Sequence, residues 1–441
     1  MNITQKKLMK INTKSIFTKN ELDRNLSRTR SKISVPFRFY LLAHINILLL
    51  ICLIIFMFDV PSFDLIHHKT LILFHAFSIG FLLLIIFGSL FQMLPVVVGV
   101  VIQYSEFLSL SLIFLFYLIF FIFYQYFTFF DHPGFFVLLL SLMILLLIFY
   151  FIIPLAKKTT KDNIGFLLSI ASFIIGLILM LFYFINLFIN LIDLDLFHIR
   201  RIHAFVMFVG FIQQLIVTVS FQVIPMFYVS KPYPKYIKYF LNYGYSVLIL
   251  IIIFFQHRIL LVLYVILNLI YIFFTSKVIL ERTRKIIDTT ILFFGLGILL
   301  LLIFSLALIF EHFTENHLGK LILIFVGFIL SFIYGMLYKI IPFLCWFHLQ
   351  STKNRIMFDF LSKNKNHRIS SIQFYMSDFS KKNLEYLQLF LFITLMILIL
   401  FLNKFIKFNI FLLLIYFTNS FYQILFALYK YKKLLNAIKI V

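Results

Sequence analysis

The feature that most constrains this chain is a series of apolar runs of about 20 residues, separated by short polar breaks. A helix of that length crosses a bilayer, because a rise of about 1.5 Å per residue spans a hydrocarbon core of about 30 Å. The runs lack the alternation of polar and apolar residues that a membrane β-barrel requires. Apolar residues make up 63% of the chain and charged residues only 12%, far from the composition of a soluble domain. The sequence therefore predicts an all-α, polytopic membrane protein.

Twelve runs are long and apolar enough to count as predicted membrane spans. In chain order, they lie near residues 37–58, 71–96, 107–130, 135–156, 164–188, 202–227, 240–256, 259–276, 288–310, 319–346, 384–403 and 405–429. Only His257 and Arg258 separate the seventh run from the eighth, so these runs form either two spans or one bent helix. The basic ends, 1–36 and 430–441, lie outside the predicted bundle, and the first apolar run is expected to be a span rather than a cleavable signal.

Lys and Arg are distributed unevenly between the two sides of the predicted membrane. If the amino terminus is cytoplasmic, 31 of the 39 basic residues fall on the cytoplasmic side. An excess of Lys and Arg in cytoplasmic loops is the usual arrangement in membrane proteins. The distribution therefore predicts a multi-pass membrane protein with both termini in the cytoplasm. We expect that membrane to be the bacterial inner membrane.

The formal net charge of +23 is explained by the lipid bilayer as a partner, because basic loops contact anionic head groups. A nucleic-acid function would require basic and aromatic residues gathered in one soluble domain, which the sequence lacks. The longest polar segment between spans, 347–383, is predicted as a cytoplasmic loop. We expect this loop to dock a respiratory-complex or maturation partner, if the protein has one.

One motif occurs three times, in the second, sixth and tenth predicted spans. Counting from a glycine, it has Phe at +1, a small residue at +8, an aromatic residue at +11, a polar residue at +12 and Pro at +15. The glycine, small, polar and proline positions are Gly80, Gly88, Gln92 and Pro95 in the first copy, Gly210, Thr218, Gln222 and Pro225 in the second, and Gly327, Gly335, Lys339 and Pro342 in the third. On an ideal helix the marked positions fall within about 120° of one another, so they share one face.

The motif divides the chain into three blocks of four spans: 37–156, 164–276 and 288–429, the last of which contains the loop 347–383. Blocks with an even number of spans insert in the same direction, so an axis along the membrane normal relates them. The sequence therefore predicts three pseudo-symmetric four-helix blocks, with the motif-bearing spans near the centre of the bundle.

A histidine precedes each copy of the motif: His75, His203 and His317. All three motif spans run from outside to inside, which places these histidines toward the external face. Neutral imidazole ligates haem iron and copper, and a histidine is costly to leave unpaired in lipid. The sequence therefore predicts a haem or copper site in the outer half, with these three residues as ligands. The alternative is that each is an interfacial histidine satisfied by its neighbours, because their offsets from the motif glycine, 5, 7 and 10, are unequal and His75 points away from the motif face on an ideal helix.

The other motif residues have both structural and functional interpretations. The small residues allow close helix packing, and the prolines bend or end their helices. Gln92, Gln222 and Lys339 occupy equivalent positions near the cytoplasmic ends of their spans, where they line a polar path for a proton or ion, or where Lys339 simply snorkels to the surface. The spans are almost free of Asp and Glu, which argues against a carboxylate relay, and no signature of a soluble enzyme is present.

Twelve spans in three parallel blocks, with histidines at the outer ends of the motif spans, resemble subunit I of haem-copper oxidases and nitric-oxide reductases. The local sequence is closer to the NnrS family of haem- and copper-containing membrane proteins linked to nitric-oxide metabolism. The resemblance rests on the opening PFRFYLLA, residues 36–43, and on His75, Gly80, Phe81, Gly88, Pro95 and Gly99. It implies haem or copper binding in a respiratory or nitric-oxide context.

Two departures from these families limit what the resemblance implies. The seventh span contains no histidine and the tenth lacks a His-x-His pair, so the ligand set of an oxygen reductase is incomplete. The His-x-His-Glu cluster of NnrS-like proteins is reduced here to Leu73, His75 and Ala76. The expected function is therefore an accessory protein holding b-type haem or copper, without oxygen-reductase activity. The alternatives are a proton-coupled or small-molecule transporter and a scaffold subunit of a membrane complex.

Overall fold

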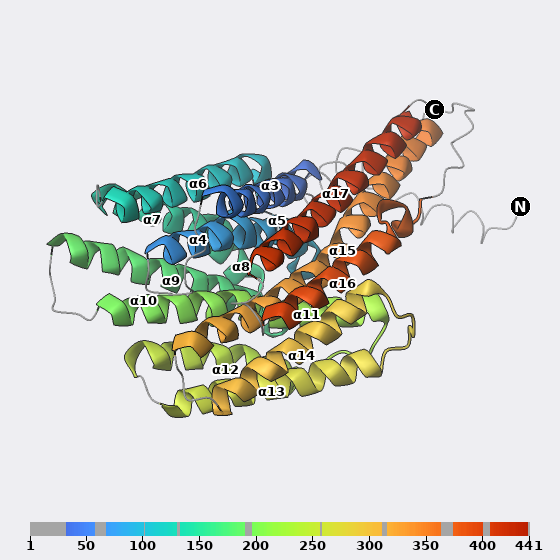
Figure 1. The fold of residues 1–441 in the computed structure, drawn as a ribbon. Helices are drawn as coiled ribbons and strands as arrows, with labels where there is room; N and C mark the ends of the chain where they lie inside the picture. The colour runs from blue at the N-terminus through green and yellow to red at the C-terminus, as the bar shows by residue number, and fades with distance from the viewer. Residues whose placement is uncertain are drawn as a thin grey trace, which may run out of the picture.

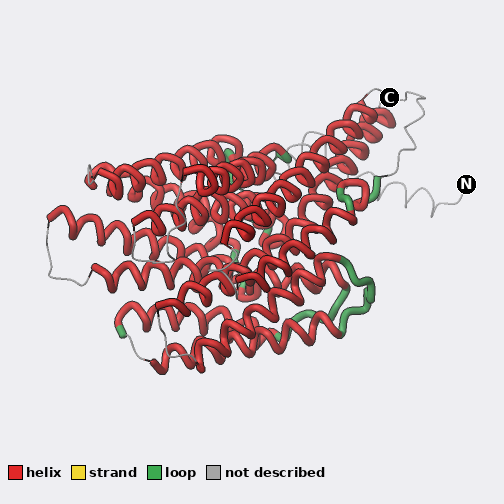
Figure 2. Tube along the Cα trace, viewed as in Figure 1, coloured by secondary structure: helices red, strands yellow, loops and turns green. Residues whose placement is uncertain are grey.

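The structure is a computed structural model that describes residues 32–57, 68–100, 102–129, 133–189, 196–255, 258–310, 315–362, 374–399 and 406–439 (Figure 1). Helices dominate these ranges and no strand occurs within them (Figure 2). Eleven helices among the described residues are long and apolar enough to cross a membrane. The predicted all-α, polytopic membrane fold is therefore confirmed.

The helices follow the predicted spans in chain order. The first block contains α3 (Ser34–Met57), a second span made of α4 (His68–Phe77), η1 (Ser78–Leu83), α5 (Leu84–Met93) and η2 (Leu94–Val98), then α6 (Ser105–Phe129), and a fourth span made of α7 (Pro133–Leu147), η3 (Ile148–Ile152) and α8 (Ile153–Lys158). The second block contains η4 (Lys161–Asn163), α9 (Ile164–Ile189), a second span made of α10 (Leu196–Phe205), η5 (Val206–Gln213) and α11 (Gln214–Tyr228), then α12 (Lys235–Phe254) and α13 (Arg258–Leu280). The third block contains α14 (Thr289–Phe310), α15 (Glu315–Ser362), η6 (Met376–Phe379), α16 (Lys382–Ile399) and α17 (Ile406–Lys439).

Two details of the span prediction are resolved by these bounds. The seventh and eighth runs form two separate helices, α12 and α13. The eleventh predicted span corresponds to α16, which is described only to Ile399 and is not among the eleven spanning helices. The following residues, 400–405, lie outside the described ranges.

Segment 347–383 differs from the predicted loop. Its first part continues α15 without a break to Ser362, so this helix has 48 residues and a length of about 72 Å. A helix of that length exceeds the bilayer core, and Figure 1 shows α15 and α17 extending together beyond the other helices, toward the chain termini. Residues 363–373 of the predicted loop lie outside the described ranges. The helix also shows that a polar composition after a span does not by itself end the helix.

The motif-bearing spans contact one another through aromatic rings. Phe74 in α4 lies 5.4 Å from Phe208 in η5, and Phe208 lies 6.2 Å from Phe325 in α15, measured between ring centroids. Farther along the same spans, the rings of Phe227 and Phe343 are 6.3 Å apart. The second spans of the three blocks therefore meet inside the bundle, while the threefold symmetry of the blocks stays a prediction.

Two of the motif spans contain wide helical turns at matching places. Gly80 lies in η1 and Gly210 lies in η5, and both segments are π-helical. A π-helical turn pairs residues five apart, so it takes in an extra residue and shifts the direction of side chains beyond it. Gly327, in the third copy, lies within the continuous helix α15. Helical angles counted from the motif glycine back to His75 and His203 therefore do not follow the ideal 3.6-residue repeat.

Several helix ends and loops meet at one end of the bundle, which we call the basic end. Here Lys158 at the end of α8 donates a hydrogen bond to the carbonyl of Gly99, and Thr283 after α13 donates to the carbonyl of Val229 after α11. The same end contains the starts of α9, α12, α14 and α16. This end corresponds to the predicted cytoplasmic side.

Candidate functional site

His75 and His203 are held in similar ways on the second spans of the first two blocks. Nδ1 of His75 lies 2.9 Å from the carbonyl oxygen of Leu71, one turn earlier in α4. Nδ1 of His203 lies 3.0 Å from the carbonyl oxygen of Gly176, in the neighbouring helix α9. A carbonyl only accepts, so in each neutral ring Nδ1 carries the hydrogen and the lone pair resides on Nε2. Both imidazoles are thereby oriented by backbone groups.

These two imidazoles are also close enough to interact electrostatically. Because η1 lies between His75 and its motif glycine, the ideal-helix direction of His75, away from the motif face, does not carry over. His317 falls in the first turn of α15, but its side chain lies outside the described residues. The structure therefore places two of the three predicted ligands on spans that contact each other, and their role as ligands stays a prediction.

The donor set fits axial ligation of a haem better than a copper site. A ligating histidine typically donates its other ring hydrogen to a carbonyl or carboxylate, as both histidines do here. Two imidazoles suffice as the axial ligands of one haem iron. Within the described residues no group of three or more His, Cys, Asp or Glu is placed to hold a metal ion. A copper site built from three such protein ligands is therefore not found in that part of the chain.

Aromatic residues close in sequence to these histidines join their spans to neighbouring helices. Phe74 precedes His75 directly, and its contact with Phe208 joins α4 to η5. Phe205 packs edge to face on Tyr264, with centroids 5.8 Å apart. These contacts place aromatic residues on both histidine-bearing spans.

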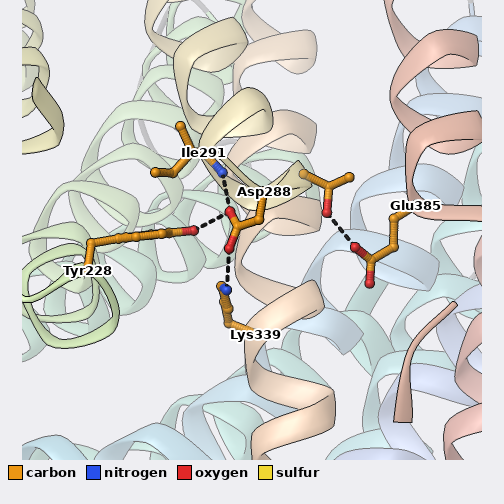
Figure 3. Close-up of polar contacts among 6 residues, drawn as sticks. Tyr228, Asp288, Ile291, Lys339 and Glu385 are labelled. Carbon is orange, nitrogen blue, oxygen red and sulfur yellow. Dashed lines mark hydrogen bonds and ion pairs between the residues drawn. The ribbon is translucent and has the colours of Figure 1, made fainter. Parts of the chain in front are cut away.

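The predicted polar-path residues have separate partners. Gln222 donates a hydrogen bond to Oδ1 of Asn163, at the start of α9. Lys339 lies within 2.5 Å of a carboxylate oxygen of Asp288, directly before α14 (Figure 3). Gln92 is buried in α5. Lys339 therefore does not simply snorkel to the surface, because its ammonium group ends in an ion pair.

At the basic end, Asp288 is the centre of a polar cluster that includes Lys339 and Tyr228. Its Oδ1 accepts hydrogen bonds from the Tyr228 hydroxyl at 2.6 Å and from the backbone N–H of Ile291 at 3.1 Å (Figure 3). Burial alone would raise the pKa of Asp288, but the hydrogen bonds from Lys339 and Tyr228 and the positive charge of Lys339 outweigh it. The pKa of this carboxyl therefore lies below its ordinary value, and Asp288 is ionised at neutral pH.

A second carboxylate, Glu385 at the start of α16, completes the cluster. Thr289 donates a hydrogen bond to its Oε2 at 2.5 Å, and Glu385 also interacts electrostatically with Lys339 and Asp288 (Figure 3). Only 7% of Glu385 is exposed, although a polar loop precedes it in sequence. Sequence reasoning missed both carboxylates, because each lies at a helix start where an acidic residue usually faces water.

The motif glycines differ in how closely other helices approach them. A Cβ at Gly88 would lie 2.7 Å from Cβ of Phe39, and a Cβ at Gly210 would lie 2.4 Å from Cδ1 of Ile249. A Cβ at Gly80 would find nothing nearer than 3.6 Å. Close packing therefore requires glycine at Gly88, a methyl group at Gly210 would displace the end of the Ile249 side chain, and Gly80 has room for a methyl group.

Comparisons with known proteins add nothing to this picture. No family model, no curated protein and no solved structure matches the chain. The resemblance to the NnrS family and to haem-copper oxidases therefore stays a prediction from the sequence.

Proposed function

We propose that this integral membrane protein binds b-type haem through His75 and His203 and serves as an accessory protein in respiratory or nitric-oxide metabolism. The observation that carries the proposal is that these two imidazoles lie on spans in contact with each other, each with Nδ1 held by a backbone carbonyl. Two ligands from separate spans would clamp the group between the first and second blocks. In the predicted topology this site lies in the outer half of the bacterial inner membrane.

The protein's own residues supply orientation and an apolar environment. The carbonyls of Leu71 and Gly176 fix the imidazole planes and make Nε2 the ligating atom. The ring contact of Phe74 with Phe208 joins the two spans that carry the histidines. A haem bound there would carry one electron at a time between partners.

The test is an absorption spectrum of the detergent-purified protein, air-oxidised and dithionite-reduced, with haem and copper measured in the same preparation. The proposal predicts a haem Soret band that is lost or weakened in His75→Ala and His203→Ala. His198→Ala is the matched control, because it removes another imidazole from α10 and should leave the band unchanged. A colourless preparation would contradict haem binding, and copper bound without haem would redirect the site to that metal.

Transport is a second candidate function, favoured by the Lys339–Asp288 pair. An ion pair beside Pro342, on a helix that contacts the other motif spans, suits a helix that changes shape during transport. Gln92, Gln222 and Lys339 would then lie along the path. The test is solute-dependent pH change in proteoliposomes. The transport proposal predicts a change that disappears in Lys339→Met, and no change with any solute class would contradict it.

A partner could dock on the helices that extend beyond the bundle. This part of the proposal rests on the length of α15 and on the basic residues of the adjoining end of α17, Lys430, Lys432 and Lys433. The test is to purify the unmodified protein and a variant with these three lysines replaced by glutamate from native membranes, and to compare the proteins that co-purify with each. Identical co-purifying proteins in both samples would contradict docking at this surface.

A further inference from the structure

His44 is a fully buried histidine near the middle of the membrane span formed by α3. Its Nδ1 lies 2.8 Å from the carbonyl oxygen of Tyr40, so Nδ1 carries the hydrogen in the neutral ring. Its Nε2 lies 2.8 Å from the Ser420 hydroxyl and 3.4 Å from the Tyr334 hydroxyl. The Ser420 hydroxyl, at the shorter distance, therefore donates to the basic nitrogen of His44, and the Tyr334 hydroxyl lies beside them.

The two hydroxyl residues that contact His44 also line a small cavity between α15, α17 and η6. The cavity has a volume of about 30 Å³, and its polar lining consists of Tyr334, Tyr338, Ser380, Ser420 and Gln423. A site needs about 10–15 Å³ for a water molecule and two or more polar partners, so this cavity is large and polar enough to hold water. Water in it would contact hydroxyls on both the His44 side and the Ser380 side.

From the cavity, polar groups continue to the basic end of the bundle. The Ser380 hydroxyl lies near enough to the carboxylate of Glu385 to stabilise its charged form, and this carboxylate accepts a hydrogen bond from Thr289. Ser380 is partly exposed, while Glu385 is buried. The charged groups that act on Glu385 are Lys339 and Asp288, from α15 and the start of α14. A titratable carboxylate is thus linked to a buried imidazole through hydroxyls and one water-sized cavity.

We propose that His44 exchanges protons with the basic end through Ser420, Tyr334, the water-filled cavity, Ser380 and Glu385. When a proton moves from the basic end to His44, the Glu385 carboxylic acid loses a proton and becomes a carboxylate. Nε2 of His44 gains a proton, and the ring becomes an imidazolium. Each hydroxyl and water accepts one proton and releases another, so each ends neutral. Glu385 then regains its proton from the aqueous phase.

The contacts of His44 suit both of its protonation states. When Nε2 is protonated, the Ser420 and Tyr334 hydroxyls turn to accept its hydrogen, since hydroxyls both donate and accept. The remaining contacts are apolar rings, with Phe81 edge-on and Phe421 stacked on the imidazole. A buried histidine that is protonated and deprotonated in turn can hold a proton inside the bundle, which serves either redox chemistry or transport. The inference is independent of His75 and His203.

The test is histidine C2 hydrogen–deuterium exchange, measured by mass spectrometry on the full-length protein in lipid nanodiscs. Exchange at C2 requires that the imidazole take up a proton and meet water or hydroxide. The proposal predicts measurable deuterium uptake at His44 in the unmodified protein. It predicts loss of that uptake in Glu385→Gln and in Ser380→Val, while Ser380→Thr, which has nearly the same shape as Val but keeps the hydroxyl, retains it.

Two controls distinguish a loss of proton access to His44 from damage to the fold. Uptake at His203 in the same digests should be equal in all variants. Glu281→Gln, which removes an exposed carboxylate paired with Lys277 at the same end, should leave uptake at His44 unchanged. No uptake at His44 in the unmodified protein, equal uptake in Glu385→Gln or Ser380→Val, or loss in Ser380→Thr would each overturn the proposal.

Discussion

Replacing Lys339 with methionine removes the cation of the ion pair while keeping an unbranched side chain of similar length. Lys339 Nζ lies 2.5 Å from Oδ2 of Asp288, and the two side chains are 17% and 27% exposed. A hydrogen bond to a charged group contributes about 1.5–3 kcal/mol, and removing one partner of a fully buried pair costs about 3–5 kcal/mol. Water reaches the partly exposed carboxylate, and Tyr228 still donates to it, so the low end applies. We expect a loss of about 2 kcal/mol, roughly a 30-fold change in the unfolding equilibrium.

A double-mutant cycle isolates this interaction from side effects of each substitution. Lys339→Met, Asp288→Asn and the double variant are unfolded with denaturant in detergent micelles, and the free energies of unfolding are compared. The expected coupling energy is about 1–2 kcal/mol, since the two side chains are in direct contact. The exposed pair Lys277 and Glu281, with 3.9 Å between charged atoms, is the control and should couple by only about 0.3–0.5 kcal/mol. Equal coupling in the two pairs would refute the reasoning.

The remaining predictions concern packing, acid and a buried network. Gly88→Ala should destabilise the fold by about 1–3 kcal/mol, the usual cost of overpacking, whereas Gly80→Ala should change it little, as measured by thermal unfolding. Because the pKa of Asp288 is lowered in the fold, its contribution should persist at neutral pH and disappear as pH falls from the ordinary value of 3.8 through the folded-state pKa. When the free energy of unfolding of Asp288→Asn is measured as a function of pH, this acid-dependent loss should be absent. Gln213→Leu should cost about 1–3 kcal/mol, since it leaves the Tyr264 hydroxyl and Asn268 without their shared partner.

The fold could be predicted because lipid leaves few choices. A backbone in hydrocarbon must satisfy its own hydrogen bonds, so long apolar runs become helices and their polar breaks become turns. The repeated motif also indicated which spans lie together, and the ring contacts of Phe208 with Phe74 and Phe325 agree with that expectation. The length of α15 was not predictable from hydropathy, because a helix continues past the membrane wherever its backbone bonds continue.

The candidate sites were less accessible from the sequence. The π-helical turns η1 and η5 change the direction of the side chains beyond them, and no residue pattern in the sequence predicts such turns. Asp288 and Glu385 are close in space but 97 positions apart in the chain, and each lies next to basic loop residues that suggest a solvated surface. His44 is the one histidine in the apolar run 37–58, so the sequence shows no partner for it. Its hydroxyl partners come from α15 and α17, which pack beside α3.

The proposed haem binding is tested most directly by measuring whether the purified protein contains haem iron and how that iron is coordinated. If His75 and His203 are the two axial ligands, the reduced haem is six-coordinate and does not bind carbon monoxide readily. Replacing either histidine with alanine should then give a five-coordinate haem that binds carbon monoxide, or loss of the haem. A haem whose spectrum and carbon monoxide binding are the same in both variants as in the unmodified protein would contradict the account.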